Sequence, residues 1–373
     1  MESYNEIQSY LDRRYDDAMD MDWYLKNWER ADKLRSLVAE MINAQAGEIF
    51  YDFNSSSALN VLSSGIDWES GANIVSTSLA FPATTLTWLN QSRRGLEVRL
   101  APAENGMVPL KRLAALVDDR TIAISLCFVE NTSGFRHNLY EVGQFCRKRG
   151  LLLAVDATQG IGAMQIDVQS MQVDFLVASS YKWLGNMFGI GFGYVSARLL
   201  ERITPRYFGW VGTPNRMNSP KDQVYYHPDA RRFELGGLNW AGLWGMEAAI
   251  KNYLSLGKAD VESYILGLTE YLYQRVTTVP GVGVVGPFPQ DNRSGITYLT
   301  FPASWELTDR VLAAHGVRVH VASPTSMRVG VHFYNNRADI DRLVEVLRFF
   351  SKGGPTPCSS VKRNQQYDEQ VPG

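Results

Sequence analysis

The chain has 373 residues, 45% of them hydrophobic and 20% charged, which is ample for a large core and for one large domain with a smaller one. The formal net charge is −2, and no segment carries charge of a single sign; this balance argues against a nucleic-acid partner. The cysteines at 127, 146 and 358 have neither the spacing of a zinc site nor that of a disulfide framework. We therefore expect no metal, and a reducing compartment such as the cytoplasm.

The N-terminal segment, residues 1–22, is acidic and polar. It contains no apolar stretch of the kind that a signal peptide requires. Elsewhere the sequence has no run of about eighteen apolar residues, the length that a membrane-spanning helix needs. The sequence therefore predicts neither a transmembrane helix nor a membrane partner.

Strand-like and helix-like patterns alternate after this segment, which is typical of an α/β fold. An amphipathic helical pattern covers 22–46. Short apolar runs predict strands at 49–53, 73–77, 98–101, 120–128, 151–155 and 175–178. Helical patterns between them lie at 58–63, 110–117 and 139–149. Continuous apolar strands of this length are expected in a mainly parallel sheet that is buried on both faces.

The rest of the chain predicts a second, smaller unit. Residues 213–230 are polar and proline-containing, so we expect a long functional loop there. Further helices are predicted at 243–256, 260–277, 308–315 and 340–349, and further strands at 296–301, 317–320 and 326–331. The predicted division is a polar segment (1–22), a large domain (23–255), a small C-terminal α/β domain (256–350) and a disordered tail (351–373).

Asp156 and Lys182 each follow one of two predicted neighbouring strands. Ligands of open α/β sheets bind beyond the carboxyl ends of the strands, so both side chains should point into one crevice. A lysine can hold an aldehyde as a Schiff base, and an acid can keep a pyridine nitrogen protonated; the pair suggests pyridoxal phosphate. Taken singly, each is more often a cap or a solvated charge, but Gln159 and Tyr181 beside them favour the cofactor site.

Two further patterns concern phosphate groups. Ser55, Ser56 and Ser57 precede a predicted helix, and hydroxyls with free amides at a helix N-terminus can bind an anion such as a phosphate; an ordinary N-cap is the structural alternative. The glycines at 189, 191 and 193 do not form G-x-G-x-x-G between a strand and a helix. An NAD-dependent dehydrogenase is therefore disfavoured.

Asp156, Gln159 and the segment 179–184, Ser-Ser-Tyr-Lys-Trp-Leu, resemble the class V aminotransferase family of fold type I pyridoxal-phosphate enzymes. The likeness extends along most of the chain. That family includes cysteine desulfurases, kynureninases and isopenicillin N epimerase-like proteins. The resemblance implies pyridoxal 5'-phosphate as cofactor, a large domain with a mainly parallel central sheet plus a smaller C-terminal α/β domain, and a homodimer with shared active sites.

The resemblance also assigns roles to residues. Lys182 and Asp156 would be catalytic, and Arg328 would bind the substrate α-carboxylate. The expected cofactor contacts are Ser55, Ser56, Ser57, Phe81, Asn131, Asp156, Gln159, Ser179, Tyr181, Lys182, Trp210 and Asn239. Phe81 would stack on the pyridine ring. Gly237 stands where relatives have a threonine that reaches the phosphate of the partner subunit's cofactor. Core packing for Phe81, turn chemistry for Asn131 and a surface strand position for Arg328 are the structural alternatives.

The expected function is chemistry at Cα or Cβ of an amino acid. Desulfurases place a nucleophilic cysteine on a C-terminal loop, whereas the only cysteine after Lys182 is Cys358 in the tail. We therefore expect a C–S lyase that eliminates a thiol from a cysteine-like or cysteine-conjugate substrate, as part of secondary metabolism. An aminotransferase, an epimerase or a decarboxylation-dependent deaminase of the same family is the alternative. A non-catalytic protein that binds the cofactor is the alternative of another class.

Overall fold

The computed structural model describes residues 2–16, 20–286 and 288–354. These residues form a seven-stranded sheet, here called the central sheet, in the order β1-β7-β6-β5-β4-β2-β3. Its strands are β1 (Ile49–Asp52), β2 (Asn73–Thr77), β3 (Glu97–Ala101), β4 (Thr121–Cys127), β5 (Leu152–Asp156), β6 (Phe175–Ser179) and β7 (Gly191–Val195). The adjacent strands β3, β2, β4, β5 and β6 run parallel, and β7 runs antiparallel to both of its neighbours, β6 and β1. The sequence therefore predicted a mainly parallel sheet correctly.

Helices cover both faces of the central sheet. In β5, Leu153 and Val155 pack into one core cluster while Leu152 and Ala154 pack into another, because alternate strand residues point to opposite faces. Helices α2 (Met21–Ile42), α6 (Leu139–Arg149) and α8 (Trp240–Leu256) contribute to the first cluster. Helices α3 (Ser55–Gly65), α4 (Pro82–Leu89) and α7 (Ala197–Leu200) contribute to the second. Helix α5 (Leu110–Ala114) lies between β3 and β4 along the chain.

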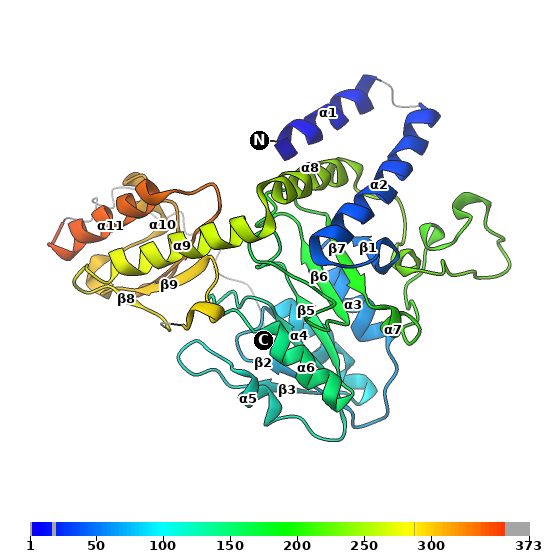
Figure 1. The fold of residues 1–373 in the computed structure, drawn as a ribbon, viewed down its shortest axis with the longest axis horizontal. Coiled ribbons are helices and arrows are strands. Elements are labelled where there is room, and N and C mark those ends of the chain that lie inside the picture. Colours follow the sequence, from blue (N-terminus) through cyan, green and yellow to red (C-terminus); the bar gives the residue numbers. More distant parts are fainter. Residues whose placement is uncertain (1, 17–19, 287, 355–373) are drawn as a thin grey trace, which may run out of the picture.

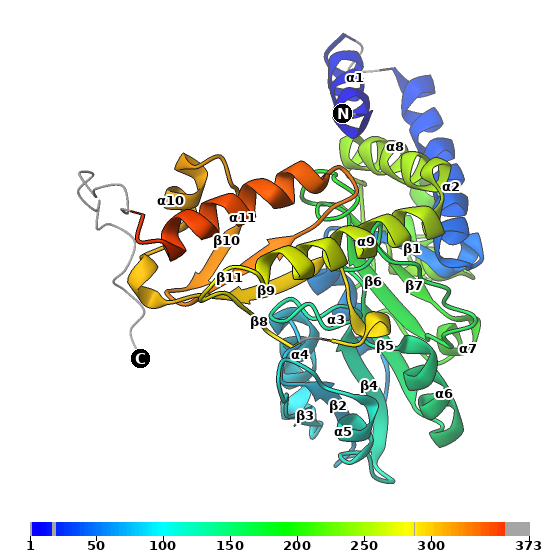
Figure 2. The ribbon, with the colours of Figure 1, turned by 60° about the vertical axis from the view of Figure 1, so that its left-hand side comes forward.

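A four-stranded antiparallel sheet, here called the small sheet, has the order β10-β11-β9-β8. Its strands are β8 (Gly283–Val284), β9 (Ile296–Thr300), β10 (His320–Ser323) and β11 (Ser326–Gly330). Helices α9 (Lys258–Val276), α10 (Asp309–Ala314) and α11 (Arg337–Ser351) share its core. Both views show α9 running from the end of α8 along this sheet (Figures 1 and 2).

Two predicted boundaries in this part of the chain are wrong. The strand expected at 317–320 begins only at His320. Ser351, the first residue of the predicted tail, is the last residue of α11, and the tail from residue 355 onward lies outside the described residues. All strands of the central sheet precede residue 255 in the sequence, and all strands of the small sheet follow it. The domain division expected at this residue stays a prediction. Short 3₁₀ helices complete the fold at Ala46–Glu48, Asn90–Arg94, Trp210–Gly212, Arg216–Asn218, Ala230–Phe233, Gln290–Asn292 and Ala303–Trp305.

The polar N-terminal segment forms a helix, α1 (Glu2–Asp16), which lies against α8 at one end of the molecule (Figure 1). Its buried Tyr10 makes aromatic contacts with Trp23 of α2 and Trp244 of α8, at centroid distances of 5.2 and 5.3 Å. These contacts hold a helix whose sequence is largely polar.

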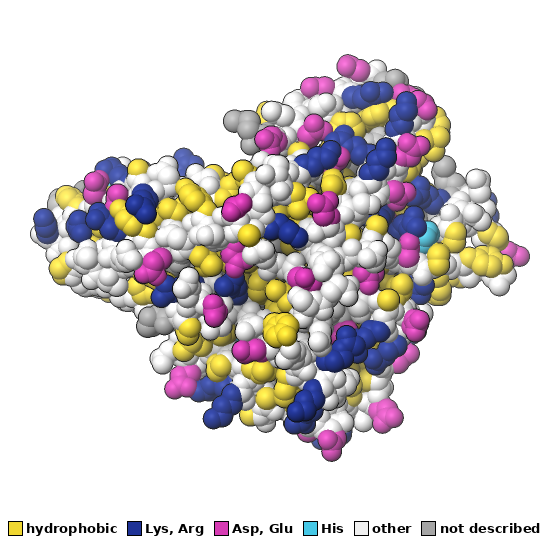
Figure 3. Space-filling view, viewed as in Figure 1, with side chains coloured by type: hydrophobic (Ala, Val, Ile, Leu, Met, Phe, Trp, Pro, Cys, Tyr) yellow, Lys and Arg dark blue, Asp and Glu magenta, His cyan; other side chains and the backbone are white. Residues whose placement is uncertain are grey.

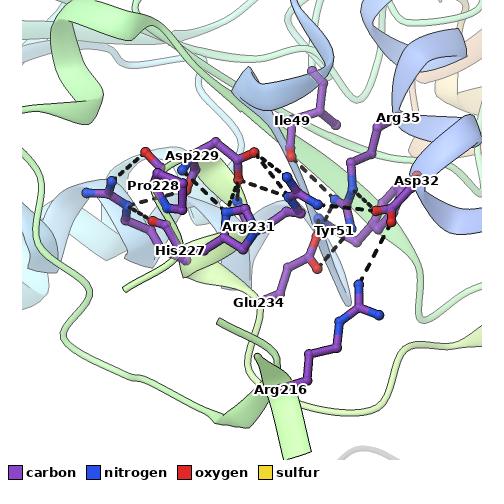
Figure 4. Close-up of polar contacts among 11 residues, drawn as sticks. Asp32, Arg35, Ile49, Tyr51, Arg216, His227, Pro228, Asp229, Arg231 and Glu234 are labelled. Carbon is purple, nitrogen blue, oxygen red and sulfur yellow. Dashed lines mark hydrogen bonds and ion pairs between the residues drawn. The ribbon is translucent and has the colours of Figure 1, made fainter. Parts of the chain in front are cut away.

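The predicted loop at 213–230 contains only short 3₁₀ helices, and ion pairs anchor the chain that follows it to α2 (Figure 4). Arg35 and Glu234, 2% and 1% exposed, form a two-pronged ion pair. The Tyr51 amide donates to Glu234 over 2.9 Å. Arg231 pairs with Asp229 and also reaches Asp32 of α2. This network fixes where the chain enters the segment 235–239.

Charge of both signs is spread over the surface. Figure 3 shows Lys and Arg interspersed with Asp and Glu on the face that it presents. Within the described residues, no helix combines the length and the apolar character needed to cross a membrane.

Candidate active site

One pocket lies at the carboxyl ends of the parallel strands. Asp156 is the last residue of β5 and pairs in register with Cys127, the last residue of β4. Lys182 lies in the turn that follows β6 and leads back into β7. Because parallel strands end at the same edge of a sheet, the acid and the lysine line the same pocket. The pocket is lined by Ser55, Phe81, Cys127, Val129, Asn131, Asp156, Thr158, Gln159, Tyr181 and Lys182.

Asp156 is a buried carboxyl, 4% exposed. Burial raises its pKa, and hydrogen bonds from Thr158 and Ser55 together with the charge of Lys182 work against that rise. The Thr158 amide donates to Oδ1 over 2.9 Å. A buried carboxylate is stable only beside a cation or several donors. A protonated pyridine nitrogen is such a cation, so the acid suits the ring of pyridoxal phosphate.

Lys182 is the amine of the pocket. Burial lowers its pKa, Arg328 lowers it further, and Asp156 opposes both. Its Nζ lies 5.6 Å from the ring centroid of Phe81 and 5.8 Å from that of Tyr181. A lowered pKa increases the share of neutral amine, the form that attacks an aldehyde. The pocket therefore gives Lys182 an environment that favours the neutral amine.

A chain of side-chain hydrogen bonds closes one side of the pocket. Gln159 Nε2 donates to Asn131 Oδ1 over 2.7 Å, and Trp183 Nε1 donates to Gln159 Oε1 over 3.2 Å. Arg328, on β11 of the small sheet, donates to the same oxygen of Asn131. The arginine thus reaches from the small sheet to the pocket, where its planar guanidinium can meet a carboxylate.

The three serines lie at the N-terminus of α3, but they differ in environment. The Ser55 amide donates to Ser179 Oγ over 2.9 Å, which ties the end of β6 to this helix. Asn54 is the N-cap, and its side chain accepts from the Ser57 amide. Ser55 lines the pocket and is buried, whereas Ser56 is exposed. The partial positive charge of the helix N-terminus remains available to an anion here.

Trp210 and Asn239 do not line this pocket within one subunit. Asn239 caps α8 and donates to the Gly189 carbonyl over 3.1 Å. It lines a neighbouring pocket together with Phe53 and Gly237. Trp210 packs edge to face against Trp28, with centroids 5.8 Å apart. The structure therefore separates these two expected cofactor contacts from Lys182 of the same chain.

Sequence reasoning missed three residues of the lining: Cys127, Val129 and Thr158. Thr158 stands between Asp156 and Gln159, which the sequence singles out, so its position was a usable signal. Cys127 ends β4, and the position at a strand end was its only signal. Burial raises the pKa of Cys127 well above its ordinary value, and its sulfur accepts a hydrogen bond from the Phe81 amide over 3.3 Å. It thus helps to hold Phe81.

Comparisons with known proteins agree with this geometry. The family model described as "Aminotransferase class-V" matches residues 5–343. The chain is 27% identical to a probable cysteine desulfurase of Methanothermobacter thermautotrophicus, over 87% of this chain and 84% of that protein. It is 30% identical to a probable cysteine desulfurase of Chlamydia muridarum, over 84% of this chain and 82% of that protein.

Solved structures share the fold. One is the cystine C–S lyase C-DES, in complex with its reaction product cysteine persulfide. It superposes on this chain with a TM-score of 0.85 at 20% identity, and the superposition covers 93% of this chain and 94% of that chain. The cysteine desulfurase of Thermococcus onnurineus gives a TM-score of 0.83 at 21% identity, with 94% and 92% covered. At these identities the likeness shows the fold.

Proposed function

The chain belongs to the class V aminotransferase family, whose members depend on pyridoxal phosphate, and from this premise we propose that it eliminates a thiol from a cysteine-like amino acid. The family match confirms the predicted class of enzyme and its cofactor, and the shared architecture confirms fold type I. One observation carries the proposed chemistry: Asp156 and Lys182 line the same pocket, with Arg328 linked to that pocket through Asn131.

The pocket residues fit the cofactor. When bound, pyridoxal phosphate supplies an electron-withdrawing ring that accepts charge as a bond to Cα breaks. Asp156 would hold the proton of the ring nitrogen, and Lys182 would bind the aldehyde carbon. Phe81 would stack on the ring, and the N-terminus of α3 at Ser55 would face the phosphate. The hydrogen-bonded amides of Asn131 and Gln159 would lie by the ring hydroxyl.

Lys182 is also the base of the proposed reaction. Burial lowers the pKa of its Nζ, which raises the share of neutral amine, so this group would take the Cα proton of a bound substrate. Arg328 would bind the substrate α-carboxylate in place of Asn131 Oδ1, which accepts its hydrogen bond here. These two residues would set the orientation of the Cα–H bond.

Cleavage without sulfur transfer to the protein is supported by the small sheet. Its strands β10 and β11 are joined by a short turn, Pro324-Thr325, which carries no cysteine. Within the described residues the thiols are those of Cys127 and Cys146, both buried, and Cys358 lies outside the described residues. The relatives named as cysteine desulfurases support a sulfur-containing amino acid as substrate. An S-substituted cysteine and water would give a free thiol, pyruvate and ammonium.

The test is a panel of S-substituted cysteines, cystine and cysteine, with thiol, pyruvate, ammonium and carbon dioxide measured together. Equal amounts of thiol and pyruvate are expected. Transfer of the amino group to an added keto acid without pyruvate would replace the lyase by an aminotransferase. Racemised substrate would indicate an epimerase, and an aldehyde with carbon dioxide would indicate a decarboxylation-dependent deaminase.

We further propose that two copies of the chain form a dimer and complete each other's sites. The pocket that contains Asn239 and Gly237 is also lined by the exposed apolar side chains of Phe53 and Leu235, and the exposed Phe188 directly precedes its residue Gly189. Exposed apolar groups of this kind mark interaction surfaces. In the proposed dimer, residues 236–239 of one copy would lie near the Lys182 pocket of the other copy. We also propose a cytoplasmic location, which the absence of a disulfide framework in the sequence supports.

A further inference from the structure

A histidine from the small sheet packs on the residue that follows Lys182. His332 lies two residues beyond β11 and is 8% exposed. Its ring is stacked on the Trp183 indole, with centroids 5.1 Å apart and planes 12° apart. Tyr334 stacks on the same imidazole at 4.0 Å. His332 is therefore fixed in a stack that connects the end of the small sheet with the lysine turn.

The same imidazole binds the backbone of the lysine turn. His332 Nε2 lies 3.0 Å from the Trp183 carbonyl oxygen. A carbonyl oxygen only accepts, so Nε2 carries the proton. No other donor to this oxygen is found among the described residues. His332 thus satisfies a buried carbonyl that would otherwise lack a partner, a loss that destabilises the local backbone conformation.

The indole of Trp183 is held on its other sides as well. Its Nε1 donates to Gln159, which in turn donates to Asn131. A side-chain carbon at Gly295, on the chain entering β9, would lie 2.5 Å from Trp183 Cη2. The indole therefore fills a space that only a glycine leaves open. Trp183 is thus contacted by residues that follow strands of both sheets.

We infer that His332 is a positioning residue for Lys182: it fixes the carbonyl and the indole of Trp183, the residue next to the lysine, and thereby the place of Nζ over the cofactor site. The inference rests on the proposed role of Lys182. Arg328 lies on β11 and His332 follows the same strand. This strand therefore positions the carboxylate-binding arginine directly and the base, Lys182, through His332. The distance between these two groups decides whether Nζ can reach the Cα proton of a bound substrate.

Two variants separate the two contacts of His332. His332→Phe keeps a flat ring between Trp183 and Tyr334 but removes the N–H donor. His332→Gln keeps a donor of similar reach and removes the ring. Tyr334→Leu is the matched control, because it loses the outer half of the stack and leaves both the donor and Trp183 intact; Tyr334 is 73% exposed. Lys182→Ala reports on the proposed function itself.

Three measurements are made on each purified holoenzyme: the pH midpoint of the visible absorbance change of the bound cofactor, the cofactor fixed by borohydride, and kcat and KM separately. We expect His332→Phe to shift the midpoint and to lower kcat about tenfold, which corresponds to about 1.4 kcal/mol, with little change in KM. His332→Gln should recover most of both values. Tyr334→Leu should match the parent.

The outcomes are distinct. If Lys182→Ala still carries cofactor that borohydride fixes, the proposed role of the lysine is wrong. If Lys182→Ala loses it while His332→Phe, with an unchanged melting temperature, has the parent midpoint and kcat, the positioning role is wrong. Equal losses in the Phe and Gln variants would also overturn it, because a purely structural role does not distinguish the donor from the ring.

Discussion

Single side chains at the ends of β4, β5 and β6 give the pocket its chemistry. Cys127, Asp156 and Ser179 each end a parallel strand, so their side chains are held by the strand pairing rather than by a flexible loop. Asp156 and Lys182 also act on each other's titration, since each lies in the electric field of the other. The protonation of the acid and of the base in the proposed reaction therefore depends on these two side chains and their immediate neighbours.

Asp156→Asn should keep cofactor binding but slow turnover. The amide keeps the shape of the side chain and loses the charge that holds a proton on the pyridine nitrogen. A loss of about 4 kcal/mol of electrostatic stabilisation would lower kcat roughly a thousandfold. Stopped-flow or steady-state rates on the cofactor-loaded variant test this. A rate equal to the parent's would mean that the reaction proceeds without ring protonation.

Arg328→Ala should raise KM strongly and lower kcat less, because a carboxylate clamp stabilises the ground state and the transition state alike. Arg328→Lys should recover only part of the affinity, since the planar fork is lost. Arg318→Ala is a matched control from an exposed position of the same unit. Initial rates over a range of substrate concentrations decide the matter. An unchanged KM in Arg328→Ala would exclude the carboxylate assignment.

His332 should make the folded protein sensitive to acid. Burial lowers its pKa from 6.5 to about 4, against the opposing effect of the Trp183 carbonyl. The neutral ring therefore stabilises the fold fully above about pH 6.5, and this contribution is lost as the pH falls toward 4. The free energy of unfolding should drop by about 2 kcal/mol more between pH 7 and pH 5 in the parent than in His332→Phe. Urea titrations at both pH values measure it, and parallel pH profiles would contradict it.

At the scale of elements, buried strands and capped helices were the features that the sequence predicted well. Helix α6 begins and ends as predicted, since Asn138 caps its start and Gly150, with a left-handed conformation, ends it. The edge strand β10 was misplaced because its residues are half exposed and carry no apolar run. The contact between Trp183 and His332 joins residues 149 positions apart, so no local pattern could predict it.

The buried ion pair between Arg35 of α2 and Glu234 connects α2 to the chain that follows the 3₁₀ helix Ala230–Phe233. Its contribution to stability can be measured. Glu234→Ala would leave the Arg35 guanidinium buried without its partner, which should lower the free energy of unfolding by about 3–5 kcal/mol. Asp32→Ala removes an ion-pair partner of the same arginine, and its carboxylate is 43% exposed; we expect a loss below about 1 kcal/mol. Chemical denaturation of both variants compares them. Equal losses would mean that burial of the pair is unimportant.

At the scale of the whole molecule, one chain supplies most but not all of the expected cofactor contacts. Seven of the predicted contacts line one pocket: Ser55, Phe81, Asn131, Asp156, Gln159, Tyr181 and Lys182. Ser56, Ser57 and Ser179 lie beside the lining without being part of it, and Trp210 and Asn239 remain apart. Sequence reasoning could place Trp210 and Asn239 along the chain but could not predict their distance from Lys182, because that distance depends on the fold and not on a local pattern. The dimer therefore stays a prediction.

Light scattering at the assay concentration should give twice the mass of one chain, 41.9 kDa, because a closed two-fold dimer covers the same apolar surface on both copies. Phe188→Asp and Leu235→Asp place charges on that surface and should dissociate it with loss of activity. Tyr140→Asp, an exposed aromatic position on α6, is the control. An active monomer would contradict the shared site.

The order in which the pocket is built along the chain has a consequence for synthesis on the ribosome. Every residue that lines the cofactor pocket precedes the end of the central sheet, while Arg328 lies on the last strand of the small sheet and His332 follows that strand. At about 5–20 residues per second, on the order of ten seconds separate Lys182 from Arg328. A growing chain therefore contains all residues that line this pocket well before it contains Arg328. The lysine can meet the aldehyde at a stage when no carboxylate clamp yet exists, so the nascent protein could acquire its cofactor before it is able to turn over an amino acid.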